Sequence, residues 1–493
     1  MIKNYYQEIE RTVGSLKFAV TILIIFTLLM IIGTFVESFC GADFANRILY
    51  KKPLFIIVQI SMFFSIYFAT TLRLPFKKRL TGFYLTHLGL MIIGFGALET
   101  YLNGIDGQIY LPPKETNRMV DLSRDEFTIE NMVSKEVVRF PLPYRAFESE
   151  LNIPFKNILI QNYIPFAKDK VEWQQPLNNY NYQSTSYYFK NAFAEQDLTF
   201  TLNPEAIDEF PNVIDLGPLK FIYLGEQSQN CFLGHLKNEN FLVNITTNEC
   251  LKKNNQLPTS NNDNLLEIST NRLKEKPTVI LFGKSILFWN KNSNKWEDRE
   301  FQKEKAIVLP WMNAELSIMN YQNNLIPKKI PYFSFPKQKK GQLIEGSLKG
   351  VSLSIMGKTY WVTNENSLGL RIQGIPYLFK LQNEKIQLPF EMTLTDFKMD
   401  KDPGTNTPAS YESFVEIFNG KIKEKAHIYM NHPFKLDGFT LYQASYNENN
   451  DGTYSTTLAV NVDQGRSLKY LGSLLLVIGA ILHFYLKSKK GSI

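Results

Sequence analysis

The hydrophobic and polar positions of this chain are unevenly distributed, and four long runs contain no Asp, Glu, Lys or Arg. About 20 apolar residues in a helix are enough to cross the hydrocarbon core of a bilayer. The runs therefore predict transmembrane helices at about 18–36, 53–72, 80–98 and 470–486. The first run is longer than the apolar region of a signal peptide and two more runs follow it directly, so we expect it to remain as a membrane span.

These spans divide the chain into three parts. Residues 1–101 form an N-terminal membrane region, residues 102–466 form one large domain, and residues 467–493 hold the last span and a basic tail. A single hydrophobic core rarely grows beyond about 250–300 residues. The large domain is therefore expected to hold one or two subdomains.

The large domain has the pattern of β-structure. Short apolar or alternating segments between turn residues predict strands, for example at Leu198–Leu202, Thr278–Phe282 and Ser352–Ile355. Few stretches keep a helical period. We therefore expect an integral membrane protein with four transmembrane α-helices (3+1) and a large, mostly-β extracytoplasmic domain.

A sharper pattern lies close to the last span. His427–Met430 and Phe439–Tyr446 have the composition of strands, and Asn431–Pro433 and Asp437-Gly438 between them are turn residues. This predicts a hairpin-like corner in which the second strand returns along the first.

Lys and Arg are concentrated in three segments that fall on one side of the membrane if the chain crosses it four times. They are the segment before the first span, the loop Arg73–Arg79 and the tail Lys487–Lys490. Because such segments stay in the cytoplasm, we expect both termini there and residues 102–466 outside. Three cations of the first loop depart from the pattern: Arg47, Lys51 and Lys52.

The net charge of +7 is partly explained by these cytoplasmic segments. Elsewhere the two signs are interspersed, and without a basic helix face or a zinc pattern we expect no nucleic-acid partner. Cys231 and Cys250 share the large domain and either form a disulfide in an oxidising compartment or remain unpaired structural thiols. Cys40 is left over.

The absent motifs exclude several activities. There is no Cys-x-x-Cys-His, so the chain is not itself a c-type cytochrome, and without Cys-x-x-Cys it is not a thiol reductant. Gly-x-Ser-x-Gly, a Walker loop and His-Glu-x-x-His are also missing. A membrane-tethered hydrolase would need a nucleophile and a base, and we predict no catalytic residue.

Two of the five histidines, His87 and His483, lie inside predicted spans. Ionisable side chains at membrane depth mark candidate functional sites, and imidazole is a common ligand of haem iron. Both histidines fall in the cytoplasmic half, so they could share one depth if their helices are neighbours. Gly94 lies on the face of His87, and Gly472 and Gly479 lie on the face of His483, where glycines allow either close helix packing or room for a flat ligand. A hydrogen bond to a helix carbonyl is the alternative role of each imidazole.

Other candidates have weaker context. The loop cations could meet haem propionates or act only as a topology signal: Arg73, Lys77, Lys78 and Arg79. His432, in the Asn-His-Pro corner, either stabilises the turn by a bond from its side chain to the backbone or is a further haem ligand. His427 and His235 have no context that suggests a role.

Several segments carry a family resemblance from one end of the chain to the other, although residues 120–390 add little. They are Gly14–Ala19 with Ile32–Ser38, Leu85–Leu90 with Gly94–Gly96, Asp402–Pro408 with Tyr411–Ser413, Met430–Phe434 with Gly438–Tyr446, and Gly465 with Tyr470–Ser473. Together with the 3+1 spans, they resemble the ResB family (also called CcsB) of system II cytochrome c biogenesis. Met430–Phe434 with Gly438–Tyr446 is the most specific match.

The resemblance implies a subunit of a haem-export and cytochrome c assembly complex in the plasma (inner) membrane, with the large domain in the periplasm or its equivalent. Its partner would be a CcsA-type tryptophan-rich membrane protein, because the five tryptophans of this chain are scattered. The pair would deliver haem b, held in transit, to apocytochrome c for thioether attachment, so the chain would act as part of a haem-attachment (synthase) complex and not alone. His87 resembles the haem ligand of the family's third helix, whereas His483 matches no family position.

A second hypothesis is a membrane-anchored extracytoplasmic binding or scaffold protein without haem. It fits the four spans and the missing catalytic motifs equally well.

Overall fold

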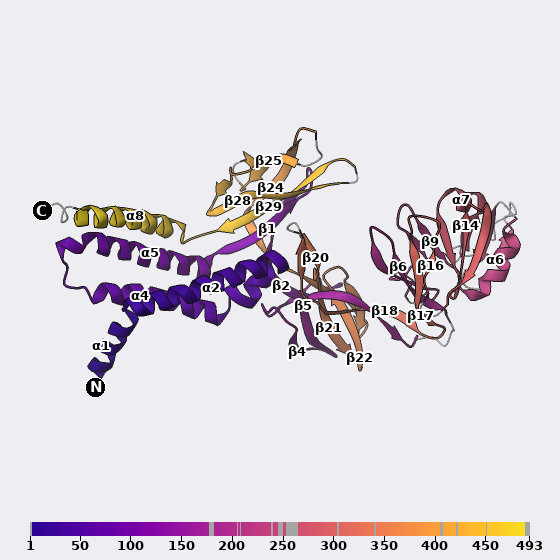
Figure 1. Ribbon diagram of the computed structural model, residues 1–493, viewed down its shortest axis with the longest axis horizontal. Coiled ribbons are helices and arrows are strands. Elements are labelled where there is room, and N and C mark those ends of the chain that lie inside the picture. The colour runs from indigo at the N-terminus through magenta and orange to yellow at the C-terminus, as the bar shows by residue number, and fades with distance from the viewer. Residues whose placement is uncertain are drawn as a thin grey trace. The chain divides into compact units, whose positions relative to one another are not determined.

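A computed structural model describes residues 2–176, 182–204, 206–207, 209–237, 240–244, 250–252, 265–302, 305–339, 342–404, 408–420, 423–449 and 451–488. The chain divides into two compact units (Figure 1). Unit 1 comprises residues 1–168 and 331–493, and unit 2 comprises residues 169–330. Strands β5 (Ile158–Gln174) and β18 (Ile326–Phe333) carry the chain out of unit 1 and back.

Within the described residues, four helices of unit 1 are long and apolar enough to cross a membrane. They are α2 (Leu16–Cys40), α4 (Pro53–Thr71), α5 (Thr81–Asn103) and α8 (Arg466–Ser488). Ser15 caps α2 by accepting a hydrogen bond from the Phe18 amide, and Pro53 occupies the first turn of α4, where no amide donor is needed. The predicted fold class is confirmed. Helices α2, α5 and α8 run beyond their uncharged runs, whereas α4 ends at Thr71, one residue before the end of its run. Shorter helices precede or join them: α1 (Ile2–Val13), α3 (Ala42–Ala45), η1 (Asn46–Tyr50) and η2 (Lys78–Leu80).

Helices α5 and α8 pack side by side because glycines repeat every seven residues on both (Figure 1). A Cβ atom built on Gly89 would lie 2.5 Å from the carbonyl oxygen of Gly472, and one built on Gly472 would lie 2.6 Å from that of Gly89. The two backbones therefore approach each other more closely than larger side chains allow.

The strands next to these helices continue the pairing. β1 (Ile105–Leu111) follows α5 directly, β29 (Tyr454–Val462) precedes α8, and the two strands are antiparallel neighbours from Ile105 opposite Val462 to Leu111 opposite Thr456. At the junction the Thr100 hydroxyl donates to Asp463 at 2.5 Å and the Lys469 ammonium donates to the same carboxylate at 2.8 Å. The first and last strands of the large domain thus continue the pair of membrane helices as one antiparallel ribbon.

The largest sheet of unit 1 has the strand order β26-β25-β24-β2-β1-β29-β28-β27, with β23 and β3 paired to β24 and β2. Its other strands are β2 (Thr116–Asn131), β3 (Val137–Pro141), β23 (Leu368–Ile372), β24 (Ile375–Lys401), β25 (Pro408–Phe418), β26 (Lys423–Tyr429), β27 (Phe434–Leu436) and β28 (Phe439–Glu448). The two ends of the sheet meet, because the Ser413 hydroxyl on β25 donates to the Gln443 side chain on β28 at 2.6 Å.

The predicted corner is therefore partly wrong. The hairpin at Asp437-Gly438 joins β27 to β28, whereas His427 lies on β26, which pairs with β25 at the other end of the strand order. The reason is that Asn431–Pro433 carries the chain across from one end of the sheet to the other. The turn chemistry was visible in the sequence, but the partner of each strand was not.

A second sheet has the strand order β18-β5-β21-β22 with β4 paired to β5, where β4 is Ser149–Phe155, β21 is Leu348–Ile355 and β22 is Lys358–Thr363. A short ribbon pairs β19 (Lys337–Lys339) with β20 (Gln342–Glu345). The long strands β2 and β24 link the two sheets. Val120 and Met392 lie in the core of the first sheet, and Phe127 and Phe379 lie in the core shared with the second.

Unit 2 has its own core of aromatic and aliphatic side chains, in which Phe200, Phe221 and Leu281 are fully buried. Its described strands are β6 (Ser184–Lys190), β7 (Glu195–Thr201), β8 (Val213–Asp215), β9 (Lys220–Tyr223), β10 (Asn240–Asn244), β11 (Cys250–Lys252), β12 (Leu265–Ser269), β13 (Thr278–Leu281), β14 (Ser285–Asn290), β15 (Lys295–Glu300), β16 (Ile307–Val308) and β17 (Glu315–Gln322), with helices η3 (Glu226–Ser228), α6 (Gln229–His235) and α7 (Thr270–Glu275). The strands predicted at Leu198–Leu202, Thr278–Phe282 and Ser352–Ile355 are confirmed as β7, β13 and part of β21. Cys231 and Cys250 are joined by a disulfide with their Cα atoms 5.8 Å apart.

Candidate functional site

His87 lies half-buried in the first half of α5, six residues after Thr81. Its Nδ1 atom is 3.0 Å from the carbonyl oxygen of Phe83, one turn earlier. Because a carbonyl can only accept a hydrogen bond, Nδ1 carries the proton in the neutral ring and Nε2 keeps its lone pair. This bond is the alternative role that the sequence offered for the imidazole, and it fixes the ring with the Nε2 lone pair as its remaining acceptor.

An aromatic ring and a cation lie next to this imidazole. The ring of Phe83 is 3.7 Å from that of His87 between centroids, and the guanidinium carbon of Arg73 is 4.5 Å from the Phe83 ring centroid. Arg73 also donates to the Ala69 carbonyl at 2.7 Å, which holds the guanidinium close to the end of α4. All four loop cations considered from the sequence are exposed, and of these Arg73 lies one ring away from His87.

His483 is on α8, the neighbour of α5, but it lies on a different face of the helix pair. Gly82 of α5 packs against the backbone of His483, and the imidazole of His483 is exposed. Five residues separate Gly82 from His87, which turns His87 by about 140° away from the α8-facing stripe. Gly94, on the face of His87, instead packs on the ring of Phe63 of α4. The helices are neighbours, yet these contacts do not bring the two imidazoles together.

The glycines that the sequence left open serve helix packing. Gly472 and Gly479 both lie against the backbone of α5, at Gly89 and Thr86. Flat space for a ligand on this stripe is therefore absent, and any ligand of His87 would lie on the other side of α5.

His432 and His427 lie on the solvent side of the large sheet and are both exposed. His432 closes a turn in which its amide donates to the Tyr429 carbonyl at 3.0 Å and Asn431 has φ +62°. Its Nδ1 is 3.2 Å from the Met430 carbonyl oxygen, the backbone contact expected of a turn-stabilising side chain. The Nε2 atom of His427 is 2.8 Å from the Glu412 carboxylate. His235, in unit 2, has its Nδ1 2.9 Å from the Cys231 carbonyl oxygen.

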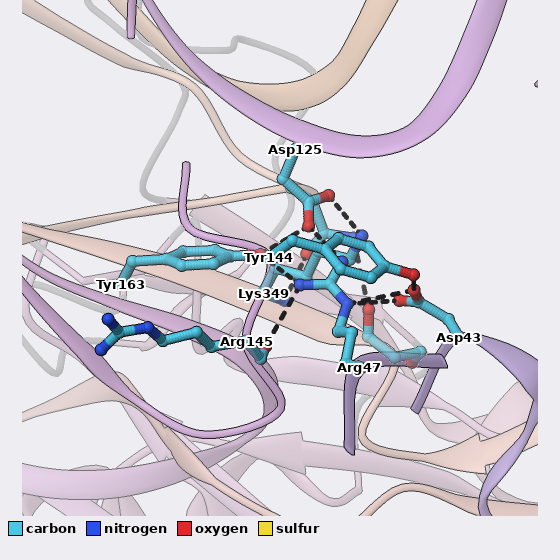
Figure 2. Close-up of polar contacts among 9 residues, drawn as sticks. Asp43, Arg47, Asp125, Tyr144, Arg145, Tyr163 and Lys349 are labelled. Carbon is cyan, nitrogen blue, oxygen red and sulfur yellow. Dashed lines mark hydrogen bonds and ion pairs between the residues drawn. The ribbon is translucent and has the colours of Figure 1, made fainter. Parts of the chain in front are cut away.

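A buried ion cluster that the sequence did not predict joins the membrane region to the large sheet (Figure 2). It consists of Asp43, Arg47, Asp125, Tyr144, Tyr163 and Lys349. Arg47, on η1 between α2 and α4, is 1% exposed and donates to Asp125 of β2 at 2.6 Å. Its Nε atom donates to both oxygens of Asp43 at 3.0 Å.

Asp125 is the centre of this cluster. It is 4% exposed, and it accepts hydrogen bonds of 2.5 Å from the Lys349 ammonium and from the Tyr163 hydroxyl in addition to that of Arg47. Burial raises the pKa of this carboxyl, but the charges of Lys349 and Arg47 outweigh burial and hold the pKa below its ordinary value. Burial and the charge of Asp125 raise the pKa of Tyr163, so its hydroxyl stays protonated and donates.

The cluster also explains two of the three cations that departed from the charge pattern, Arg47 and Lys51. Arg47 is neutralised inside the protein by two carboxylates, and the Lys51 ammonium lies 5.0 Å from the ring centroid of Tyr144. The only sign of this cluster in the sequence was that Arg47 and Lys51 departed from the charge pattern. Nothing in the sequence around Asp125, Tyr163 or Lys349 marks them as partners of Arg47.

The comparison with protein families bears on the C-terminal part of unit 1. Residues 369–455 match the ResB-like family. The chain therefore contains a ResB-like domain. This domain runs from β23 into the first residues of β29, and the resemblance seen in the sequence is confirmed. Of the family segment Asp402–Pro408, Thr405–Thr407 lie outside the described residues.

Two curated proteins are similar to the chain that carries this ResB-like domain. Protein NrfI of Wolinella succinogenes is 32% identical over 100 residues, which cover 20% of this chain and 11% of NrfI. Cytochrome c biogenesis protein CcsB of Prochlorococcus marinus is 35% identical over 99 residues, which cover 20% of this chain and 23% of CcsB. The matches thus span less than a quarter of either relative.

Proposed function

We propose that this chain is a membrane-bound component of cytochrome c biogenesis that helps deliver haem to apocytochrome c on the outer side of the membrane. The ResB-like domain and the similarity to a protein named for cytochrome c biogenesis support the pathway. The observation that carries the haem step is His87, an imidazole in an apolar helix whose Nδ1–H is held by the Phe83 carbonyl and whose Nε2 is left to bind iron.

The donors around His87 suit haem better than a bare ion. Among the described residues no group of three or more His, Cys, Asp or Glu could hold a metal ion. Haem brings four equatorial nitrogens of its own, so it needs only an axial ligand from the protein. Arg73, one ring away, has the charge to pair with a propionate. Haem b is thus the expected cargo, with His87 as ligand and His483, on the other face, as a weaker candidate.

Two observations support placing the large domain outside the cytoplasm and both termini inside. Arg47, the main exception to the charge pattern, is buried in an ion cluster and no longer argues against an outer position of the first loop. The disulfide between Cys231 and Cys250 is of the kind that persists in oxidising compartments. The plasma (inner) membrane of a bacterium-like cell has a cytoplasmic side for the basic segments and an oxidising outer side for the disulfide.

The partners follow from what this chain offers. Large apolar side chains remain exposed along α2, α4, α5 and α8, as expected for surfaces covered by lipid or by another membrane protein. We propose that a CcsA-type tryptophan-rich membrane protein covers part of this surface and that the two act together as the haem-attachment complex.

The visible absorption spectrum tests this function. The detergent-solubilised chain would be purified with its CcsA-type partner as wild type and as His87→Ala, with His235→Ala as a matched control whose Nδ1 also bonds a backbone carbonyl. We expect a Soret band that weakens or shifts in His87→Ala and is unchanged in His235→Ala. Complexes that contain no haem, or a spectrum that His87→Ala leaves unchanged, would favour the scaffold protein without haem.

A further inference from the structure

Four side chains on the ResB-like domain form a continuous stack of rings, the ring stack: Phe414, His427, Tyr429 and His432. Phe414 and His427 are 4.4 Å apart between centroids with planes 7° apart, and Tyr429 and His432 are 4.0 Å apart with planes 16° apart. The middle pair, His427 and Tyr429, is 4.5 Å apart and tilted by 31°. The stack begins on β25, crosses to β26 and ends in the turn after β26.

The ring stack lies on the solvent side of the sheet. Val415 and Ala426, next to Phe414 and His427 in the chain, are buried in the core, so the alternate positions point outward. β26 is also the last strand at its end of the sheet order. Packing of the core therefore does not account for four rings in register on the outer face.

The two histidines of the stack differ in what their Nε2 atoms do. That of His427 is occupied by the Glu412 carboxylate at 2.8 Å. In His432, Nδ1 faces the Met430 carbonyl, which places the proton there, and Nε2 makes no hydrogen bond within the described part of the chain. His432 is thus an exposed imidazole with a fixed ring and an unused lone pair.

The orientation of the stack favours a flat, metal-bearing ligand. An axial imidazole lies in a plane that contains the iron–nitrogen bond, and the porphyrin is perpendicular to that bond. The stacking direction is perpendicular to the imidazole plane, so a porphyrin bound at His432 would run parallel to the stack. It would then extend along the direction in which Tyr429 and His427 are stacked.

We propose that His432 is a second, extracytoplasmic axial ligand for haem and that Tyr429 and His427 form the surface on which the porphyrin lies. A bare metal ion is disfavoured because the described residues offer no cluster of three ligating side chains. Haem needs only one ligating side chain, since the porphyrin supplies four nitrogens of its own. The inference rests on the proposed haem-delivery function, in which haem must be held outside before it meets apocytochrome c. The inference adds a second haem-binding site, on the side of the membrane where apocytochrome c accepts haem.

The test is a titration with ferric haem of the full chain in detergent, in a background of His87→Ala and His483→Ala that removes both membrane imidazoles. We expect a Soret band shifted as in imidazole-ligated haem. His432→Ala should weaken binding roughly tenfold or more, since the loss of even an outer partner of a metal ligand costs about that much in affinity. Tyr429→Leu, which keeps the imidazole, should weaken binding less, and His235→Ala should leave it unchanged.

Thermal unfolding separates ligand loss from misfolding. A His432→Ala chain that unfolds at the temperature of the parent background but binds haem more weakly has lost a ligand, whereas a collapsed corner would lower the unfolding temperature as well. Absence of haem binding in the parent background, or binding that His432→Ala does not change, would overturn the inference. The two proposals fail separately: if His87→Ala leaves the spectrum of the purified complex unchanged while His432→Ala removes the titrated site, the membrane ligand is wrong and the outer site stands.

Discussion

Arg47, in the connection between two membrane helices, donates a 2.6 Å hydrogen bond to Asp125 of the large β-sheet, and the two side chains are 1% and 4% exposed. They are 78 residues apart in the sequence. The pair fixes the connection between the end of α2 and the start of α4 to strand β2 through the ion cluster. Any movement of these helices relative to the sheet would have to separate two buried charges.

Asp125→Ala is expected to destabilise unit 1 strongly. It would leave Arg47 and Lys349 facing each other without their shared carboxylate, and breaking a buried ion pair in this way typically costs about 3–5 kcal/mol. Thermal unfolding of the detergent-solubilised chain, followed by circular dichroism, measures the loss. Glu384→Ala is the matched control, because it removes the exposed partner of Arg124, and such pairs contribute at most about 1 kcal/mol. Equal effects of the two substitutions would show that the cluster does not hold unit 1 together.

The same carboxylate makes stability depend on pH. Its pKa in the folded protein lies below the ordinary 3.8, so folding favours the ionised form. Its contribution is therefore present above about pH 4 and is lost as the pH falls through the folded pKa. We expect the difference in unfolding free energy between wild type and Asp125→Asn to shrink as the pH is lowered from 6 towards 3. A difference that stays constant over this range would mean that the proton balance of Asp125 does not change on unfolding.

The sequence predicted the fold where local composition decides it. Apolar runs determined the spans, and alternating segments such as that around Leu198 determined strands, because each depends on residues close together in the chain. The pairing of strands depends on residues far apart, and here the prediction of the corner failed: the strand with His427 and the strand with Tyr446 lie at different ends of the sheet order. No local pattern separates these two outcomes.

The same distinction applies to the candidate sites. His87 could be found because an imidazole in an apolar run is conspicuous, and its tautomer follows from the carbonyl one turn earlier. The ion cluster and the ring stack could not be found, because their members come from different elements and each is an ordinary residue in its own segment. Arg47 was visible only as an exception to the charge pattern.

Substitution by alanine is expected to lower stability at Gly89 of α5, which packs against α8, and to raise stability at Gly234 of α6, which has open space around it. Alanine at Gly89 would place its Cβ 2.5 Å from the Gly472 carbonyl oxygen, so α5 and α8 would have to separate, at a cost of about 1–3 kcal/mol. Gly234 on α6 has open space at its Cβ position, and there alanine is expected to stabilise by up to about 1 kcal/mol. Thermal unfolding of the two variants compares the signs. Stabilisation by Gly89→Ala would contradict the close approach of the two helices.

Thiol labelling tests the disulfide and with it the side of the membrane on which unit 2 lies. Cys231 and Cys250 are bonded, whereas Cys40 is free and partly exposed, so a maleimide added to the denatured chain from an oxidised preparation should label Cys40 alone. Reduction should release both other thiols and destabilise unit 2 by about 2–4 kcal/mol, because the bond closes a chain segment of 19 residues. Limited proteolysis measures the loss of stability of unit 2 on reduction, and Cys40→Ser is the control because it keeps the disulfide. Labelling of all three cysteines in chain taken directly from intact cells under acid quench would place unit 2 in a reducing compartment and remove one of the two supports for an outer domain.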